Sequence, residues 1–152
     1  MKKILLVAVL LLLISSAALF AAEPREGIKA GLVTGLPFHI GAIGEYDFGV
    51  ASASVALGYG SGSFLLRMGG DYHFDKPFVN SDWGIDLYLS VGGHLDIFIF
   101  SGGAAVALGI PVTWSWYMDD LPLKFFVKAG PEIFFNFGGL DFLGSAGAMY
   151  QF

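Results

Sequence analysis

Apolar and polar side chains alternate along most of the chain beyond residue 26. A period of two residues is typical of a β-strand with two different faces. The segment 82–95 shows the pattern most clearly, with one face made of Trp83, Ile85, Leu87, Leu89 and Val91 and the other of Asp82, Gly84, Asp86, Tyr88, Ser90, Gly92 and His94. The pattern predicts about eight strands, at 27–36, 39–48, 50–60, 63–74, 82–95, 103–117, 122–135 and 141–152.

The composition indicates which strand face points outward. Hydrophobic residues make up 55% of the chain and charged residues only 14%, which is too few to cover a soluble domain of this size. The polar faces carry many small side chains, which suit the narrow interior of an eight-stranded barrel. We therefore expect the apolar faces to contact lipid. The predicted fold class is all-β: an antiparallel up-and-down transmembrane β-barrel of about eight strands.

The first residues have the layout of a secretory signal peptide. Lys2 and Lys3 precede the apolar run 4–14, and mostly small residues follow as far as Ala21. We expect residues 1–21 to be cleaved and 22–152 to form the barrel; an uncleaved membrane anchor is the alternative. The mature part would hold six basic and thirteen acidic residues, a net charge of −7 that argues against nucleic acid as a partner. The chain has no cysteine, so no disulfide or thiolate chemistry is expected.

Aromatic residues on the predicted outer face gather at one level of the barrel. If both termini are periplasmic, these residues would form a girdle at the membrane interface. The alternative is that Trp and Tyr are simply common in strands. The girdle residues are Tyr72, Trp83, Trp114, Trp116, Tyr150 and Phe152, with Phe74 beside Tyr72.

Charged residues of both signs fall on the predicted inner face. Charges in a narrow, poorly solvated lumen must be paired. We interpret them as a network of salt bridges that fills the barrel, because eight strands leave no aqueous channel. A gated pore or a proton path is the functional alternative. The network residues are Lys29, Glu45, Asp47, Arg67, Asp71, Asp86, Lys128 and Glu132.

The candidate catalytic chemistry is weak. The pairs Asp71/His73 and His94/Asp96 could suggest a hydrolytic site, but they are predicted to lie at opposite ends of the barrel. The His-x-Ser motif of lipid A deacylase barrels is absent, since each of the three histidines has Gly or Asp two residues later. Asp119-Asp120 is best explained as a solvated turn. We expect no catalytic residues, no metal and no cofactor.

Two features depart from a regular barrel. Pro111 and Pro131 lie inside predicted strands, where a missing N–H predicts a bulge or a kink. The predicted connections are short throughout, and the longest is residues 75–81.

The last strand ends in Tyr150-Gln151-Phe152. In architecture, export signal and this ending, the chain resembles small eight-stranded bacterial outer-membrane barrels, such as the transmembrane domain of outer membrane protein A and outer membrane protein X. The resemblance implies that Tyr150 and Phe152 act as an assembly signal read by the barrel assembly machinery, with outer-membrane lipids as the other partners. The segment from Leu108-Gly109-Ile110-Pro111 to Gly130-Pro131-Glu132 also resembles a family of small barrels of unknown function.

The expected function is therefore that of a non-enzymatic structural barrel in the outer membrane. A lipid-modifying barrel enzyme and a periplasmic lipocalin-like carrier are the alternatives. The sequence predicts no particular ligand or surface partner.

Overall fold

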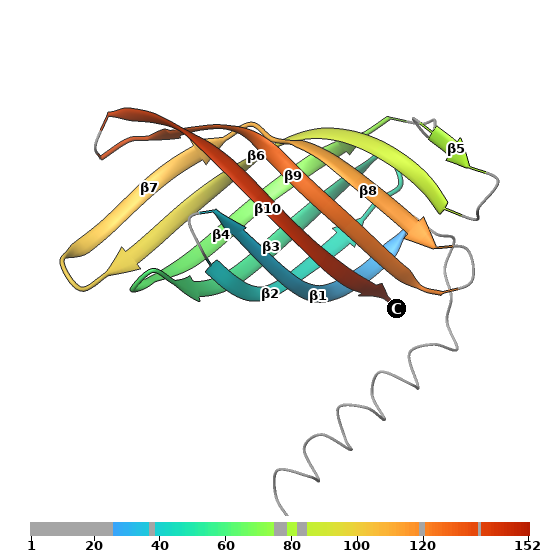
Figure 1. Cartoon of the computed structure of the whole chain (residues 1–152), viewed down its shortest axis with the longest axis horizontal. Coiled ribbons are helices and arrows are strands. Elements are labelled where there is room, and N and C mark those ends of the chain that lie inside the picture. The colour runs from blue at the N-terminus through green and yellow to red at the C-terminus, as the bar shows by residue number, and fades with distance from the viewer. Residues whose placement is uncertain (1–25, 37–38, 75–78, 82–84, 119–120, 137) are drawn as a thin grey trace, which may run out of the picture.

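A computed structural model describes residues 26–36, 39–74, 79–81, 85–118, 121–136 and 138–152. The described residues form strands joined by turns (Figure 1). No helix among them has the length and apolar character needed to cross a membrane. The strands are β1 (Gly27–Leu36), β2 (His39–Asp47), β3 (Ala51–Gly60), β4 (Ser63–His73), β5 (Val79–Ser81), β6 (Ile85–Phe100), β7 (Gly103–Gly109), β8 (Val112–Met118), β9 (Leu123–Phe134) and β10 (Gly139–Gln151).

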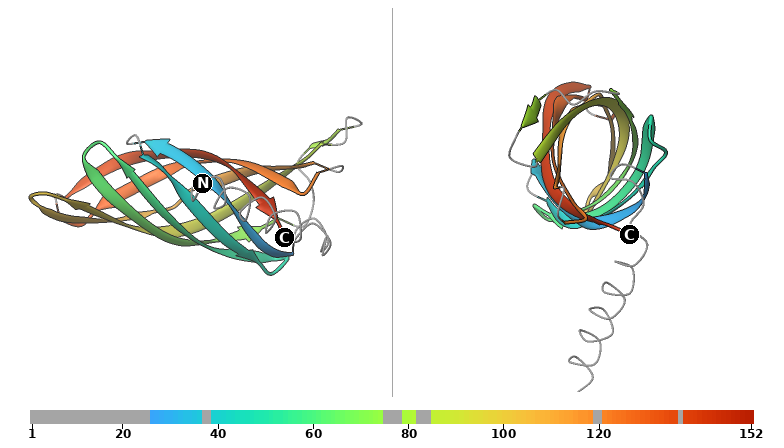
Figure 2. Two further views of the ribbon diagram at one scale, coloured as in Figure 1. Left: turned by 90° about the horizontal axis from the view of Figure 1, so that it is seen from below. Right: turned by 90° about the vertical axis from the view of Figure 1, so that its right-hand side faces the viewer.

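The strands close into an antiparallel barrel. β1 pairs with β2 on one side and with β10 on the other, so the first and last strands of the barrel close the ring. Viewed along its axis, the barrel forms a ring (Figure 2). β7 and β8 follow each other along one barrel strand between β6 and β9, while β5 pairs only with the start of β6. The predicted all-β, antiparallel, eight-stranded barrel is confirmed.

Most strand positions agree with the sequence pattern, but two do not. β6 runs to Phe100, five residues beyond the predicted end at residue 95. The predicted connection 75–81 contains β5, whereas residues 75–78 lie outside the described part of the chain. β6 is long because it pairs with β4 and β5 on one side and with β7 and β8 on the other.

Of the bulge or kink predicted at the two prolines, the bulge is absent. The regular strand is interrupted at residues 110–111, between β7 and β8. His94 still faces Gly109 and Val91 faces Val112, so the pairing register does not change. The neighbouring strands use the proline carbonyl groups. Gly92 N donates to Pro111 O at 3.1 Å, and Ile110 N donates to Pro131 O at 3.0 Å. Each proline carbonyl therefore accepts a hydrogen bond from the neighbouring strand, but the proline has no N–H to donate one back. The loss of that bond does not change the register of the strands.

The turns at the end remote from the C-terminus are short. β3 and β4 are joined by Ser61-Gly62, which both have positive φ, at 49° and 75°. Two central residues with positive φ define the tight hairpin turn that matches strand twist. β6 and β7 are also joined by two residues, and β9 and β10 by four. The described turns at this end therefore extend little beyond the barrel wall.

Candidate functional site: the charged lumen

The interior of the barrel is more polar than its surface. Among the described residues, 17 buried side chains are polar or charged and 10 are hydrophobic, whereas many large hydrophobic side chains are exposed. This distribution is the reverse of that in a water-soluble domain. The period-two alternation produces it, because each strand points one face into the lumen and the other outward.

Two lysines and two carboxylates form a compact group at the end of the lumen near the C-terminus. Lys29 Nζ donates to Asp47 Oδ2 at 2.8 Å and lies 3.7 Å from Glu45 Oε1. Lys124 Nζ donates to Glu45 Oε1 at 2.6 Å. The ring of Tyr117 lies 5.7 Å from both lysine nitrogens. All four charged side chains are buried, so they compensate one another in the absence of bulk water.

Two further ion pairs lie deeper along the barrel. Lys128 Nζ on β9 donates to Asp71 Oδ2 on β4 at 2.5 Å. Arg67 donates to both oxygens of Asp96 on the neighbouring β6, through Nε at 2.7 Å and Nη2 at 2.5 Å. This is the two-pronged guanidinium–carboxylate geometry that fixes both side chains. The pairs connect strands across the lumen as well as along the wall.

The structure places most of the predicted network residues in the lumen. Lys29, Glu45, Asp47, Asp71, Lys128 and Glu132 are buried there, and Arg67 is partly buried. The side chain of Asp86 lies outside the described part of the structure. The predicted set omits Lys124 and Asp96. Alternation in segment 122–135 already places Lys124 on the inner face, whereas Asp96 fell beyond the predicted end of its strand.

His73 forms a short chain of polar contacts with Asp47 and Ser90. His73 Nδ1 lies 2.6 Å from Ser90 Oγ, and Nε2 lies 3.5 Å from Asp47 Oδ2. The order Ser, His, Asp is that of a nucleophilic triad. However, the Ser90 side chain is only 1% exposed, and none of the three residues lines the described lumen cavity. A nucleophile needs room for a substrate beside it, so this arrangement is better explained as lumen packing.

His94 and Asp96 do not lie at the opposite end of the barrel from Asp71 and His73. Because β6 continues to Phe100, Asp96 faces Arg67 in the middle of β4, and Asp71 faces Gly92 only two residues before His94. The two histidine pairs therefore belong to neighbouring levels of one interior.

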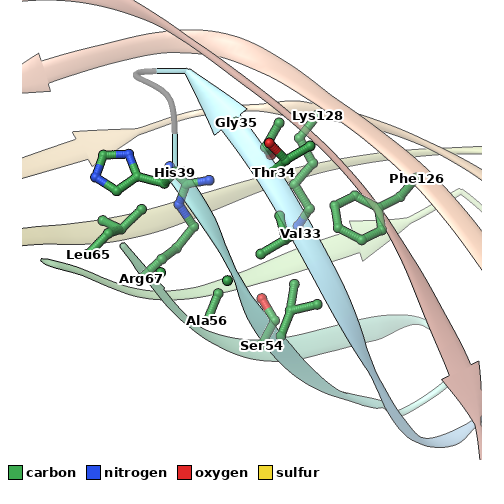
Figure 3. A pocket seen from close by; sticks show the side chains of 14 residues that line it. Val33, Thr34, Gly35, His39, Ser54, Ala56, Leu65, Arg67, Phe126 and Lys128 are labelled. Atoms are coloured by element: carbon green, nitrogen blue, oxygen red, sulfur yellow. The ribbon is translucent and has the colours of Figure 1, made fainter. Parts of the chain in front are cut away.

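Apolar groups fill the lumen between the ion pairs. One cluster consists of Ile43, Ala56, Phe126 and Met149, and a second of Leu65, Phe98, Ala105 and Ala107. Between them lies a cavity of about 30 Å³, bordered by Val33, Leu65, Arg67, Phe126 and Lys128 among others (Figure 3). That volume accommodates one or two water molecules, far less than a small-molecule pocket.

The outer face carries aromatic residues near both ends. Tyr72 and Phe74 are 54% and 44% exposed, with ring centroids 5.9 Å apart, and Tyr150 and Phe152 form a similar pair at 5.2 Å. Trp114 and Trp116 are half-buried in β8, and Trp83 lies outside the described residues. The structure adds Tyr46 and Phe48, with ring centroids 4.7 Å apart, to this level.

The ends of three strands repeat one pattern. Tyr46-Asp47-Phe48, Tyr72-His73-Phe74 and Tyr150-Gln151-Phe152 each place two aromatic rings outside and one polar side chain inside. At the opposite end, exposed aromatics stand beside the turns: Tyr59, Phe64, Phe100, Phe135 and Phe142. Aromatic bands near both ends of an apolar wall are typical of membrane barrels.

Comparison with solved structures identifies a similar fold. The N-terminal β-barrel domain of OprF from Pseudomonas aeruginosa is similar over 84% of this chain and 98% of that domain, with a TM-score of 0.56 and 16% sequence identity. No protein-family model matches the chain, and no curated protein matches it either. The chain thus has the fold of the small eight-stranded barrels, as its sequence predicts. The resemblance of its segment 108–132 to a second small-barrel family stays a prediction.

Proposed function

We propose that this protein is a structural barrel of the bacterial outer membrane, without enzymatic activity, whose lumen is closed by paired charges. One observation carries the proposal: the polarity of the barrel is inverted, with charges buried inside and large apolar side chains exposed outside. Water would penalise that exterior, whereas lipid favours it. The aromatic bands at both ends would then mark the two membrane interfaces.

The similarity to the OprF barrel domain supports this proposal at the level of the fold. Outer-membrane lipids would be the principal partners. Tyr150 and Phe152 both face outward at the edge of the barrel, a position that suits the proposed assembly signal. The predicted signal peptide, residues 1–21, would supply export and lies outside the described residues.

The two alternatives find less support. A lipocalin-like carrier would need an apolar cavity large enough for a ligand, and the described lumen cavity holds only about 30 Å³. A lipid-modifying enzyme would need its reactive groups beside the outer leaflet, whereas Ser90, His73 and Asp47 are buried inside. The structural role is therefore the one that we propose.

Cell fractionation tests the proposal directly. The protein should sediment with outer membranes and stay there after carbonate extraction. Folded barrels resist unfolding in detergent, so unheated samples should also migrate faster on gels than boiled ones. A product found only in the soluble periplasmic fraction would contradict the membrane assignment, and would leave the barrel fold itself untouched.

A further inference from the structure

His94 and Glu132 approach each other across a glycine. In the strand pairing, His94 on β6 lies opposite Gly109 on β7, and Gly109 lies opposite Glu132 on β9. A Cβ atom on Gly109 would lie 2.3 Å from His94 Nε2, so the imidazole occupies the space that any larger residue at 109 would fill. Glycine at this position thus allows the histidine of one strand to reach the carboxylate two strands away.

Asp96 completes a three-residue cluster. It follows His94 by two residues on the same inner face of β6, and its Oδ2 lies 3.9 Å from His94 Nε2. Glu132 Oε1 lies 3.9 Å from the same nitrogen. One ligand atom from each of the three residues falls within 4.8 Å of the other two. The three residues are 5%, 0% and 2% exposed for His94, Asp96 and Glu132, so the cluster is shielded from bulk solvent.

Two of these atoms lack a hydrogen-bond partner among the described residues: His94 Nε2 and Glu132 Oε1. Glu132 also has no lysine or arginine within salt-bridge distance in the described part of the chain, unlike Asp96, which Arg67 holds. A buried carboxyl group needs a proton or a compensating positive charge, and a buried ring nitrogen needs a hydrogen-bond partner or a metal. Both requirements point to the same location, the space between the three side chains.

We propose that His94, Asp96 and Glu132 bind a divalent transition-metal ion, with zinc as the best match, inside the barrel. Imidazole nitrogen and carboxylate oxygen are both zinc ligands, and with three protein ligands a water molecule would take the fourth position. Calcium and magnesium instead prefer oxygen ligands alone, and more of them. Tetrahedral zinc spaces its ligands roughly 3.4 Å apart. The two 3.9 Å separations from His94 Nε2 would need to contract by about half an ångström, and the two carboxylate oxygens lie within 4.8 Å of each other.

Arg67 fits the role of an outer partner. It binds both oxygens of Asp96 and so fixes the orientation of that carboxylate, while each oxygen keeps a lone pair for a metal. The bound ion would join β6 to β9 across β7. This inference depends on the barrel fold and does not depend on the proposed location in a membrane.

The test uses the purified barrel without an affinity tag, folded in detergent micelles and treated with chelator. We expect equilibrium dialysis to show one zinc ion per chain, with little competition from millimolar magnesium. Cobalt added in place of zinc should give visible absorption bands from the mixed nitrogen and oxygen ligands. His94→Gln and Glu132→Gln should each weaken zinc binding at least ~100-fold, because loss of a direct ligand should exceed the loss typical of an outer partner.

His39→Gln is the matched control. His39 is also a buried lumenal histidine, but its Nε2 lies 3.0 Å from Ser63 Oγ, and it is not part of the cluster. This variant should bind zinc like the unmodified barrel. Heat-dependent gel migration checks that each variant is folded, and if a ligand variant does not fold, the cobalt spectrum of the unmodified barrel decides. Absence of those bands, or unchanged zinc affinity in folded His94→Gln and Glu132→Gln barrels, would overturn the proposal.

Discussion

Lys128 and Asp71 show at the scale of single residues how the lumen depends on pairing. Each is the only salt-bridge partner of the other among the described residues, and both are buried. Removing one partner leaves an uncompensated charge in a poorly solvated interior, which is far more costly than removing both.

Lys128→Met alone should therefore destabilise the barrel by about 3–5 kcal/mol, and Asp71→Asn by a similar amount. The double variant should cost much less than the sum of the two. Urea unfolding in lipid vesicles, analysed as a double-mutant cycle, measures the difference. Strictly additive costs would mean that the pair contributes no interaction energy.

Val55 tests which side of the wall faces lipid. It lies in the middle of β3 and is 50% exposed, while Val50 lies in the turn before β3 and is 59% exposed. Val55→Arg should cost roughly 2–4 kcal/mol in vesicles, and Val50→Arg about 0–1 kcal/mol, because a cation is tolerated near the interface. Free energies of folding into vesicles measure both. If Val55→Arg changes stability by no more than about 0.5 kcal/mol, as a surface substitution in water would, the exterior does not contact lipid.

At the scale of the element, strand β2 contrasts two glycines. A Cβ on inward-facing Gly41 would lie 2.1 Å from Leu57 O and 2.6 Å from the Cα of Gly58, both on the neighbouring β3. A Cβ on Gly44 would meet nothing within 4 Å. The close approach of two backbones on the concave side of the wall, rather than strand propensity, therefore requires glycine at 41.

Gly41→Ala should destabilise the barrel by about 1–3 kcal/mol through overpacking. Gly44→Ala should be neutral or stabilise it by up to ~1 kcal/mol, because glycine weakens a strand interior. Urea unfolding of the two variants side by side gives the comparison. Equal effects would show that the inner face of β2 can move to accommodate a methyl group.

At the scale of the whole molecule, side chains fill most of the barrel lumen. Ion pairs and apolar clusters alternate along its interior, and the described cavity between them measures about 30 Å³. Eight strands leave room for side chains and little else.

Planar bilayers containing the purified protein should accordingly show little or no steady conductance. Conductance recordings at several voltages and salt concentrations provide the measurement. Stable, large channels would contradict a closed lumen and would favour the alternative of a gated pore.

Local sequence patterns alone predicted most of the barrel. The alternation in 103–117 and 122–135 depends only on the two-residue period of a strand, so strand positions and inward residues such as Lys124 can be found without knowing the neighbouring strands. The same alternation shows that apolar residues share one face of each strand and that polar and small residues share the other. The composition then indicates that the apolar faces point outward.

Only the tertiary structure decided which inward residues meet. Lys124 and Glu45 are 79 residues apart in sequence, and their contact depends on how the ends of the sheet join at β1 and β10. The length of β6, and with it the inward position of Asp96, depends on partners on both of its sides. Nothing in the sequence pattern distinguishes Gly109. Its position opposite both His94 and Glu132, without a side chain, leaves space for the imidazole of His94 to approach Glu132. Pairing across strands is a long-range property, because closure of the barrel fixes all registers together.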